Sequence, residues 1–279
     1  MTNNTIVVGV TDAAAARRAL DWAITRARQR RQKLLLVSVV GGAVGAVGEG
    51  YVVHHALEAT ERMLADDAAR ATEAGIEVET RVGRGNPIDQ LIAASEGAEL
   101  LVIGSDYRGT GGPVRGNRGI RIAAGAHCPV VAIPDVAYDE RSGIVVGVDG
   151  SELSEAAVAF AAAEADRLGE PLIAVSVWTP LVVPLGTGAY PEDYLKNMQT
   201  LTEESQALAL AGLRQDYPDL DIRTVVVSGY PAAEIARVGK KATLVVVGSR
   251  GRGPVARFLL GSVSQEVLTH LPTATAVVR

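Results

Sequence analysis

The chain alternates between short apolar runs rich in β-branched residues and longer, alanine-rich stretches with helical spacing. Because few polar residues interrupt the apolar runs, we expect strands that are buried on both faces of a sheet. Alternation of such strands with helices is typical of a parallel sheet covered by helices on both sides. The pattern predicts strands at 6–10, 34–40, 76–82, 100–103 and 130–133, and again at 144–148, 172–178, 222–227, 244–247 and 274–278.

The same landmarks occur twice, in the same order. "IVVGVTD" at Ile6 matches "IVVGVDG" at Ile144, and "LLLVSVV" matches "LIAVSVW". Further along, "LLVIGS" matches "LVVVGS", and "AHCPVV" matches "THLPTA". We therefore expect two copies of one α/β domain, at 1–135 and 144–279. Each should be an open, doubly wound sheet of five mainly parallel strands with helices on both faces. The polar, turn-rich segment "PDVAYDERSG" predicts a linker.

Composition narrows the class of protein. The formal net charge is −5 at pH 7, and Cys128 is the single cysteine among 279 residues. Without a basic face we expect no DNA partner, and one cysteine excludes an intramolecular disulfide and a cysteine-based zinc site. We expect Cys128 to be a buried apolar residue. The N-terminal segment lacks the pattern of a signal peptide and no apolar run suits a bilayer, so we expect a cytoplasmic protein without a membrane partner.

The segments that follow the strands carry the candidate chemistry, because doubly wound sheets bind ligands beyond the carboxyl ends of their strands. In the second copy, "VDGSELS" follows the first strand and offers Asp149 or Ser151 as a helix N-cap. After the fourth strand comes "GSRGRGPVARFLLGSVS". Its glycines let a backbone approach a ligand, and free amides at a helix start attract phosphate. A mobile loop followed by an ordinary serine N-cap stays open as the other interpretation.

The common nucleotide fingerprints are missing. The chain has neither the Gly-Lys-Ser/Thr frame of a Walker A loop nor a G-x-G-x-x-G after its first strand. The spacing of a hydrolytic triad is not visible either. His54 and His55 predict no metal site because no third ligand is placed nearby, and we interpret His127 and His270 as turn residues.

The spacing Gly248-x-x-Gly251, nine residues, then Gly261-Ser262 resembles that of the ATP-binding universal stress proteins. "IVVGVDGS", "LVVVGSRGRG", "LLGSVS" and "VLTHLPTATAVV" extend the resemblance over essentially the whole chain. It implies a bound adenine nucleotide, ATP or else AMP or ADP, with Mg²⁺, used for regulation of stress response or dormancy without a catalytic residue. It also implies pairing of the two domains and a homodimer. The site residues that it implies are Asp149 at the ribose, Val177 at the adenine, and Gly248, Gly251, Gly261, Ser262, Val263 and Ser264 at the phosphates.

The first copy departs from this pattern. Thr11 stands in place of Asp149, Tyr107 stands in place of Gly251, and "GNRG" lies where the second copy has its glycine and serines. We therefore expect the nucleotide in the second copy, with weak or no binding in the first. Two other functions stay open. One is a nucleotide-hydrolysing enzyme of the related ATP pyrophosphatase-like fold, and the other is an interaction module that binds no nucleotide.

Overall fold

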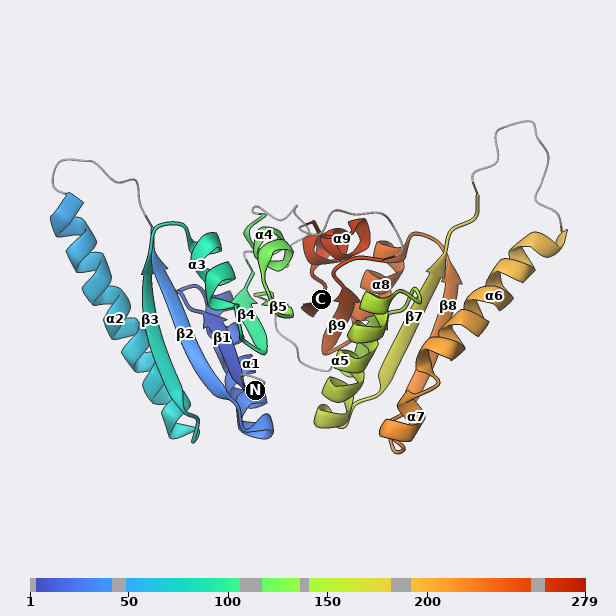
Figure 1. Ribbon diagram of the computed structural model, residues 1–279, viewed down its shortest axis with the longest axis horizontal. Coiled ribbons are helices and arrows are strands. Elements are labelled where there is room, and N and C mark those ends of the chain that lie inside the picture. Colours follow the sequence, from blue (N-terminus) through green and yellow to red (C-terminus); the bar gives the residue numbers. More distant parts are fainter. Residues whose placement is uncertain (1–3, 42–48, 106–116, 136–140, 182–191, 252–258) are drawn as a thin grey trace. The chain divides into compact units, whose positions relative to one another are not determined.

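The computed structural model describes residues 4–41, 49–105, 117–135, 141–181, 192–251 and 259–279 (Figure 1). The chain divides into two compact units, Met1–Val136 and Ala137–Arg279. Each unit contains five of the ten strands that the described residues form. Half of the predicted linker, residues 136–140, lies outside the described residues.

The first unit alternates strands and helices throughout. Its strands are parallel and lie in the order β3-β2-β1-β4-β5. The order therefore reverses between β1 and β4. The elements are β1 (Thr5–Gly9), α1 (Ala14–Arg30), β2 (Lys33–Val40), α2 (Glu49–Glu73), β3 (Val78–Arg84), α3 (Pro87–Ala94), β4 (Leu100–Gly104), α4 (Arg118–Gly125) and β5 (Val130–Ile133).

The second unit repeats this arrangement. Its strands are parallel and lie in the order β10-β9-β6-β7-β8, so the order reverses between β6 and β9. The predicted α/β class with parallel strands is confirmed, and strand ends differ from the predicted ones by two residues at most. The elements are β6 (Ile144–Gly147), α5 (Glu152–Leu168), β7 (Leu172–Trp178), α6 (Glu192–Leu210), α7 (Leu213–Asp216), β8 (Ile222–Ser228), α8 (Pro231–Gly239), β9 (Leu244–Gly248), α9 (Ser262–His270) and β10 (Ala274–Val278).

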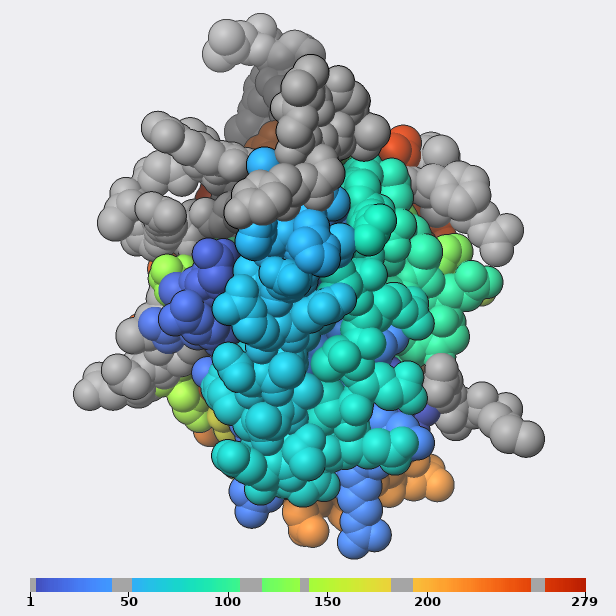
Figure 2. All heavy atoms as spheres, turned by 90° about the vertical axis from the view of Figure 1, so that its left-hand side faces the viewer, coloured from blue at the N-terminus to red at the C-terminus, as the bar shows by residue number. Residues whose placement is uncertain are grey.

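Helices cover both faces of the strands in each unit, as right-handed crossovers require. In the first unit α1 and α2 cover one face, while α3 packs against α4 on the other (Figure 1). In the second unit α5 and α6 cover one face, and α8 packs against α9 on the other. Figure 2 shows α2 at the surface of the first unit beside β3, with which it is in contact. Among the described helices, none combines the length and apolar character needed to cross a membrane.

Burial varies from strand to strand, and this corrects one expectation. All residues of β5 and β10 are buried, as are those of β4 and β9 up to the final glycine. In β3, by contrast, Gly83 is the one buried residue, and β8 buries none of its residues. The prediction that every apolar run is buried on both faces is therefore wrong for β3 and β8. Both strands carry polar and charged residues, in "VETRVGR" of β3 and "IRTVVVS" of β8, and these residues are exposed.

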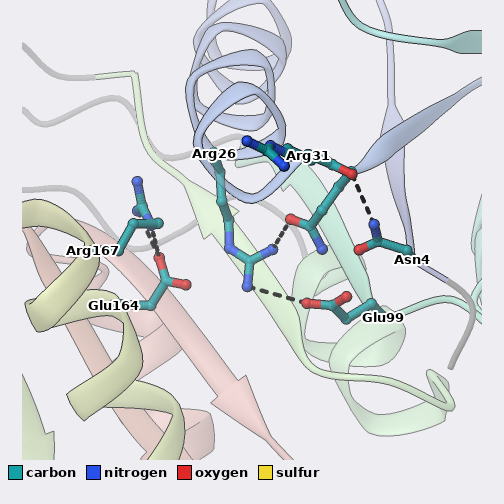
Figure 3. A network of polar contacts seen from close by, with 7 residues as sticks. Asn4, Arg26, Arg31, Glu99, Glu164 and Arg167 are labelled. Carbon is teal, nitrogen blue, oxygen red and sulfur yellow. Dashed lines mark hydrogen bonds and ion pairs between the residues drawn. The ribbon is translucent and has the colours of Figure 1, made fainter. Parts of the chain in front are cut away.

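One helix position in each unit carries a buried charged side chain (Figure 3). Arg26 of α1 is 2% exposed; its guanidinium donates to Gln32 Oε1 at 2.5 Å and lies 3.6 Å from Glu99. At the matching position of α5, Glu164 is fully buried and accepts two hydrogen bonds from Arg167. Removing one partner of such a pair leaves a buried charge uncompensated, so we interpret both pairs as parts of the framework.

The third major helix begins differently in the two units. In α3 the N-cap Asn86 accepts a hydrogen bond from Ile88 N at 3.1 Å, whereas Tyr230 at the N-cap of α8 makes no such bond and is 72% exposed. An Asn N-cap stabilises a helix by about 0.5–2 kcal/mol relative to a residue that cannot accept this bond. We therefore expect Tyr230→Asn to raise the free energy of unfolding by roughly 1 kcal/mol in urea denaturation.

The reciprocal change provides the control for this prediction. Asn86→Ala removes the cap of α3 and should lower the free energy of unfolding by a similar amount, about 1 kcal/mol. If Tyr230→Asn left the unfolding midpoint unchanged while Asn86→Ala lowered it, then capping would not limit the stability of α8.

Candidate functional site

A pocket of about 250 Å³ opens at the carboxyl ends of the strands of the second unit. It lies beside the ends of β6 and β9, where the strand order reverses, which is the position at which doubly wound sheets bind ligands. The structure brings every one of the expected site residues to this pocket: Asp149, Val177, Gly248, Gly251, Gly261, Ser262, Val263 and Ser264.

One wall of the pocket is apolar. It is formed by Val148 after β6, by Val175 and Val177 of β7, and by Pro231 and Ile235 of α8. Sequence reasoning missed the two residues of α8, although Pro231 belongs to a Gly-x-Pro landmark that occurs in both copies. Such a wall suits a flat, weakly polar group such as a nucleobase.

The loop after β6 orients the carboxylate of Asp149. Gly150 adopts a φ of 74°, which turns the chain so that Asp149 Oδ1 accepts hydrogen bonds from Ser151 N at 3.0 Å and Ser151 Oγ at 2.6 Å. Ser151 caps α5 by accepting from Ser154 N at 3.2 Å, and Ser154 Oγ accepts from Asp149 N at 3.1 Å. Of the two candidate N-caps, the structure selects Ser151. Sequence reasoning missed Ser154, the last residue of "VDGSELS".

The loop after β9 is closed at its base by backbone carbonyls. Ser249 O accepts hydrogen bonds from Gly261 N at 2.7 Å and from Ser264 Oγ at 2.9 Å. Ser264 is 1% exposed, and its Oγ also lies 2.9 Å from Gly261 O. Its hydroxyl proton is therefore directed to the loop backbone, although the family resemblance places Ser264 at the phosphates. Residues 252–258 of the loop lie outside the described residues.

At the N-terminus of α9, the backbone amides at the pocket have no hydrogen-bond partner among the described residues. Its N-cap is Gly261, which has no side chain to cap the helix. The amides of Ser262, Val263 and Ser264 precede the first intrahelical bond, which Gln265 N donates to Gly261 O. Unpaired amides and the helix dipole together attract anionic groups. The side chain of Ser262 is exposed, so its hydroxyl is accessible at the same place.

Gly248 is required by packing rather than by a ligand. A Cβ at this position would lie 2.9 Å from Leu153 O in the first turn of α5. In the first unit, a Cβ at Gly104 would lie 2.5 Å from the backbone of Ala15 and Ala16 in α1. Both glycines therefore allow a strand end to approach a helix closely. The presence of Gly104 in the first copy consequently says nothing about nucleotide binding there.

No metal cluster forms within the described part of the chain, since no three His, Cys, Asp or Glu side chains there are grouped to hold an ion. His54 and His55 lie on α2, and each contacts Glu58. Asp149 is the single carboxylate among the described residues of the pocket. A divalent cation at this pocket would therefore take most of its oxygen ligands from the bound molecule and from water, as Mg²⁺ commonly does.

In the first unit, the segments at the carboxyl ends of the strands lack the carboxylate and the serines that the second unit has at its pocket. Thr11 Oγ1 accepts from Ala13 N at 3.3 Å, which preserves the turn but supplies no carboxylate. Ala16 replaces the second serine of the α5 cap, and Arg121 replaces the buried serine that closes the loop of the second unit. Tyr107, which stands in place of a glycine, lies outside the described residues. The described residues of the first unit therefore contain neither the oriented carboxylate nor the hydroxyl anchor.

The fold and the pocket define a tandem α/β protein in which the second domain has a pocket at its strand-order reversal. The chain belongs to the universal stress protein family, whose sequence profile matches residues 2–134 and 141–279. It is 33% identical over 288 residues to universal stress protein Rv2623 of Mycobacterium tuberculosis, and the match covers 98% of this chain and 96% of that protein.

A second relative supports the same assignment, and a solved structure shows the same fold. A universal stress protein of Mycolicibacterium smegmatis is 32% identical over 291 residues, covering 98% of this chain and 96% of that one. Among solved structures, a universal stress protein of Archaeoglobus fulgidus has the same fold, with a TM-score of 0.74 at 18% identity over 100% of this chain and 99% of that one. The family resemblance seen in the sequence motifs is confirmed, and so is the tandem arrangement.

Proposed function

We propose that the second unit binds ATP, or another adenine nucleotide, and that binding serves regulation in stress response or dormancy. One observation carries the proposal: three kinds of chemistry converge on a single pocket. An apolar wall suits the base, the oriented carboxylate of Asp149 suits the sugar hydroxyls, and the uncapped start of α9 suits the phosphates.

The volume of the pocket is consistent with a nucleotide whose base and sugar lie inside it and whose phosphates lie at its exposed side. Its volume of about 250 Å³ lies just below the range of about 300–1,000 Å³ of small-molecule sites. Such a volume suits the nucleoside part, with the phosphates extending along the exposed side of Ser262. Mass spectrometry of ligand released from protein purified without added nucleotide tests the proposal, together with calorimetric titration of ATP and Mg²⁺.

The same pocket favours binding over catalysis. Its described lining contains no His, Lys or Cys, and its one carboxylate accepts two hydrogen bonds from Ser151 through Oδ1. A nucleotide hydrolase needs a group that orients or deprotonates the attacking water. For deprotonating that water, the described lining offers no group other than Asp149.

We therefore expect ATP turnover far below the typical enzyme rate of about 10 s⁻¹. Release of phosphate and of pyrophosphate should be measured at steady state with saturating ATP and Mg²⁺. A rate near the typical value that disappears in Asp149→Ala would favour the ATP pyrophosphatase-like alternative. Absence of any nucleotide binding in calorimetry would instead leave the interaction module as the function.

A further inference from the structure

We infer that Gly251 serves the carboxylate of Asp149 rather than the phosphates of the ligand. Its missing side chain leaves the space in which Ser151 holds that carboxylate in one orientation. Gly251 and Ser151 are then positioning residues that determine the preference of the site for a sugar bearing hydroxyl groups. The inference rests on the proposed function of this pocket and adds a source for its sugar specificity.

Gly251 lies directly beside the carboxylate of Asp149. A Cβ at this position would overlap Asp149 Oδ2 and would lie 3.5 Å from Asp149 Cγ. No other described atom outside the neighbouring residues lies within 4 Å of that Cβ. Gly251 is also absent from the glycines with positive φ, so its backbone conformation is open to other residues. Among the described residues, the need for space beside Asp149 is therefore the reason for a glycine at position 251.

Ser151 holds the carboxylate of Asp149 in place. Asp149 Oδ1 accepts hydrogen bonds from both N and Oγ of Ser151, at 3.0 and 2.6 Å. Ser151 is itself fixed as the N-cap of α5. A methyl group at position 251 would push Oδ2 aside. Rotation of the carboxylate about its Cβ–Cγ bond to make room would also move Oδ1 relative to Ser151, and so disturb the two hydrogen bonds between them. The second oxygen, Oδ2, receives no hydrogen bond from the described residues and is the atom available to a sugar hydroxyl.

The two copies supply independent support. Where Asp149 is replaced by Thr11, Gly251 is replaced by Tyr107. Gly104, which close packing against α1 requires, is present in the first copy although the carboxylate is absent. Both copies thus have a glycine where the strand end packs against a helix, at Gly104 and Gly248. At the position of Gly251, only the copy that also has the carboxylate has a glycine.

The test compares ATP with 2′,3′-dideoxy-ATP, which has the same base and phosphates but no sugar hydroxyls. In calorimetric titrations of the full chain, the wild type should prefer ATP by about tenfold or more, the value of a hydrogen bond to a charged group. Gly251→Ala should abolish this preference by weakening ATP alone, and Ser151→Ala should reduce it, while Ser151→Thr restores it. Ser262→Ala is the matched control, since it should weaken both ligands by the same factor.

Two outcomes of the titrations would overturn the inference. Equal weakening of both ligands by Gly251→Ala would assign this glycine to the phosphates, and an unchanged preference would show that the carboxylate tolerates a side chain at 251. If the wild type binds neither ligand, the proposed function fails, and a measurement without ligand decides the inference. The ¹³Cγ resonance of Asp149 should then shift in Gly251→Ala, and an unmoved resonance would refute the positioning role.

Discussion

Gly261→Glu should abolish binding of ATP while leaving the fold intact. Gly261 is the N-cap of α9 and has φ −66° and ψ 157°, a conformation that any residue adopts. A Cβ there would lie 3.2 Å from Arg250 Cα, a close contact that a shift of the loop by a few tenths of an ångström relieves. The new carboxylate would then lie beside the free amides of α9, occupy the place of the phosphates and repel them.

Calorimetric titration measures this loss, and circular dichroism establishes that the variant is folded. Gly119→Glu, at the start of α4 in the first unit, introduces the same charge at the corresponding helix and should leave the affinity unchanged. Ser262→Ala should produce an intermediate effect of roughly ten- to a hundredfold, because it removes one hydrogen bond to a charged group. Unchanged affinity in a folded Gly261→Glu variant would place the nucleotide elsewhere.

The second large effect is asymmetry: we expect the full chain to bind one nucleotide, in the second unit. The first unit has Thr11 in place of the carboxylate, and Arg121 in place of the serine that anchors the loop. Ligand at a hundred times its dissociation constant stabilises the domain that binds it by about 2.7 kcal/mol. For a domain of this size the melting temperature should rise by roughly 5–15 °C, and the first unit should show no such rise.

Titration stoichiometry and hydrogen exchange measure the asymmetry in the intact chain. One equivalent of ATP should bind, and amides of β9 and α9 should exchange more slowly with ATP present, while those of β4 and α4 should not change. A stoichiometry of two in the wild type that falls to one in Gly261→Glu would contradict the prediction. It would show that the loop of the first unit binds nucleotide without the carboxylate.

Patterns in the sequence predict the class of fold, the tandem repeat and many of the residues that meet at the pocket, although not Ser154, Pro231 and Ile235. Apolar runs such as "TLVVV" before Gly248 predict buried parallel strands, and the carboxyl ends of such strands lie on one edge of a sheet. Segments that are distant along the chain, at Asp149, Val177 and Gly261, therefore converge for a reason visible in the pattern. Spacing alone was enough to relate those segments to a known family.

What each of these residues does depends on contacts that exist only in the folded domain. Gly248 and Gly251 look equivalent in a spacing motif, yet one makes room for the backbone of α5 and the other for the carboxylate of Asp149. Ser262 and Ser264 look like a pair of donors, yet the hydroxyl of Ser264 is buried and bound to the loop backbone. The physical reason is the same in both cases: the role of a residue depends on the atoms opposite it, and those atoms belong to segments that folding alone brings near.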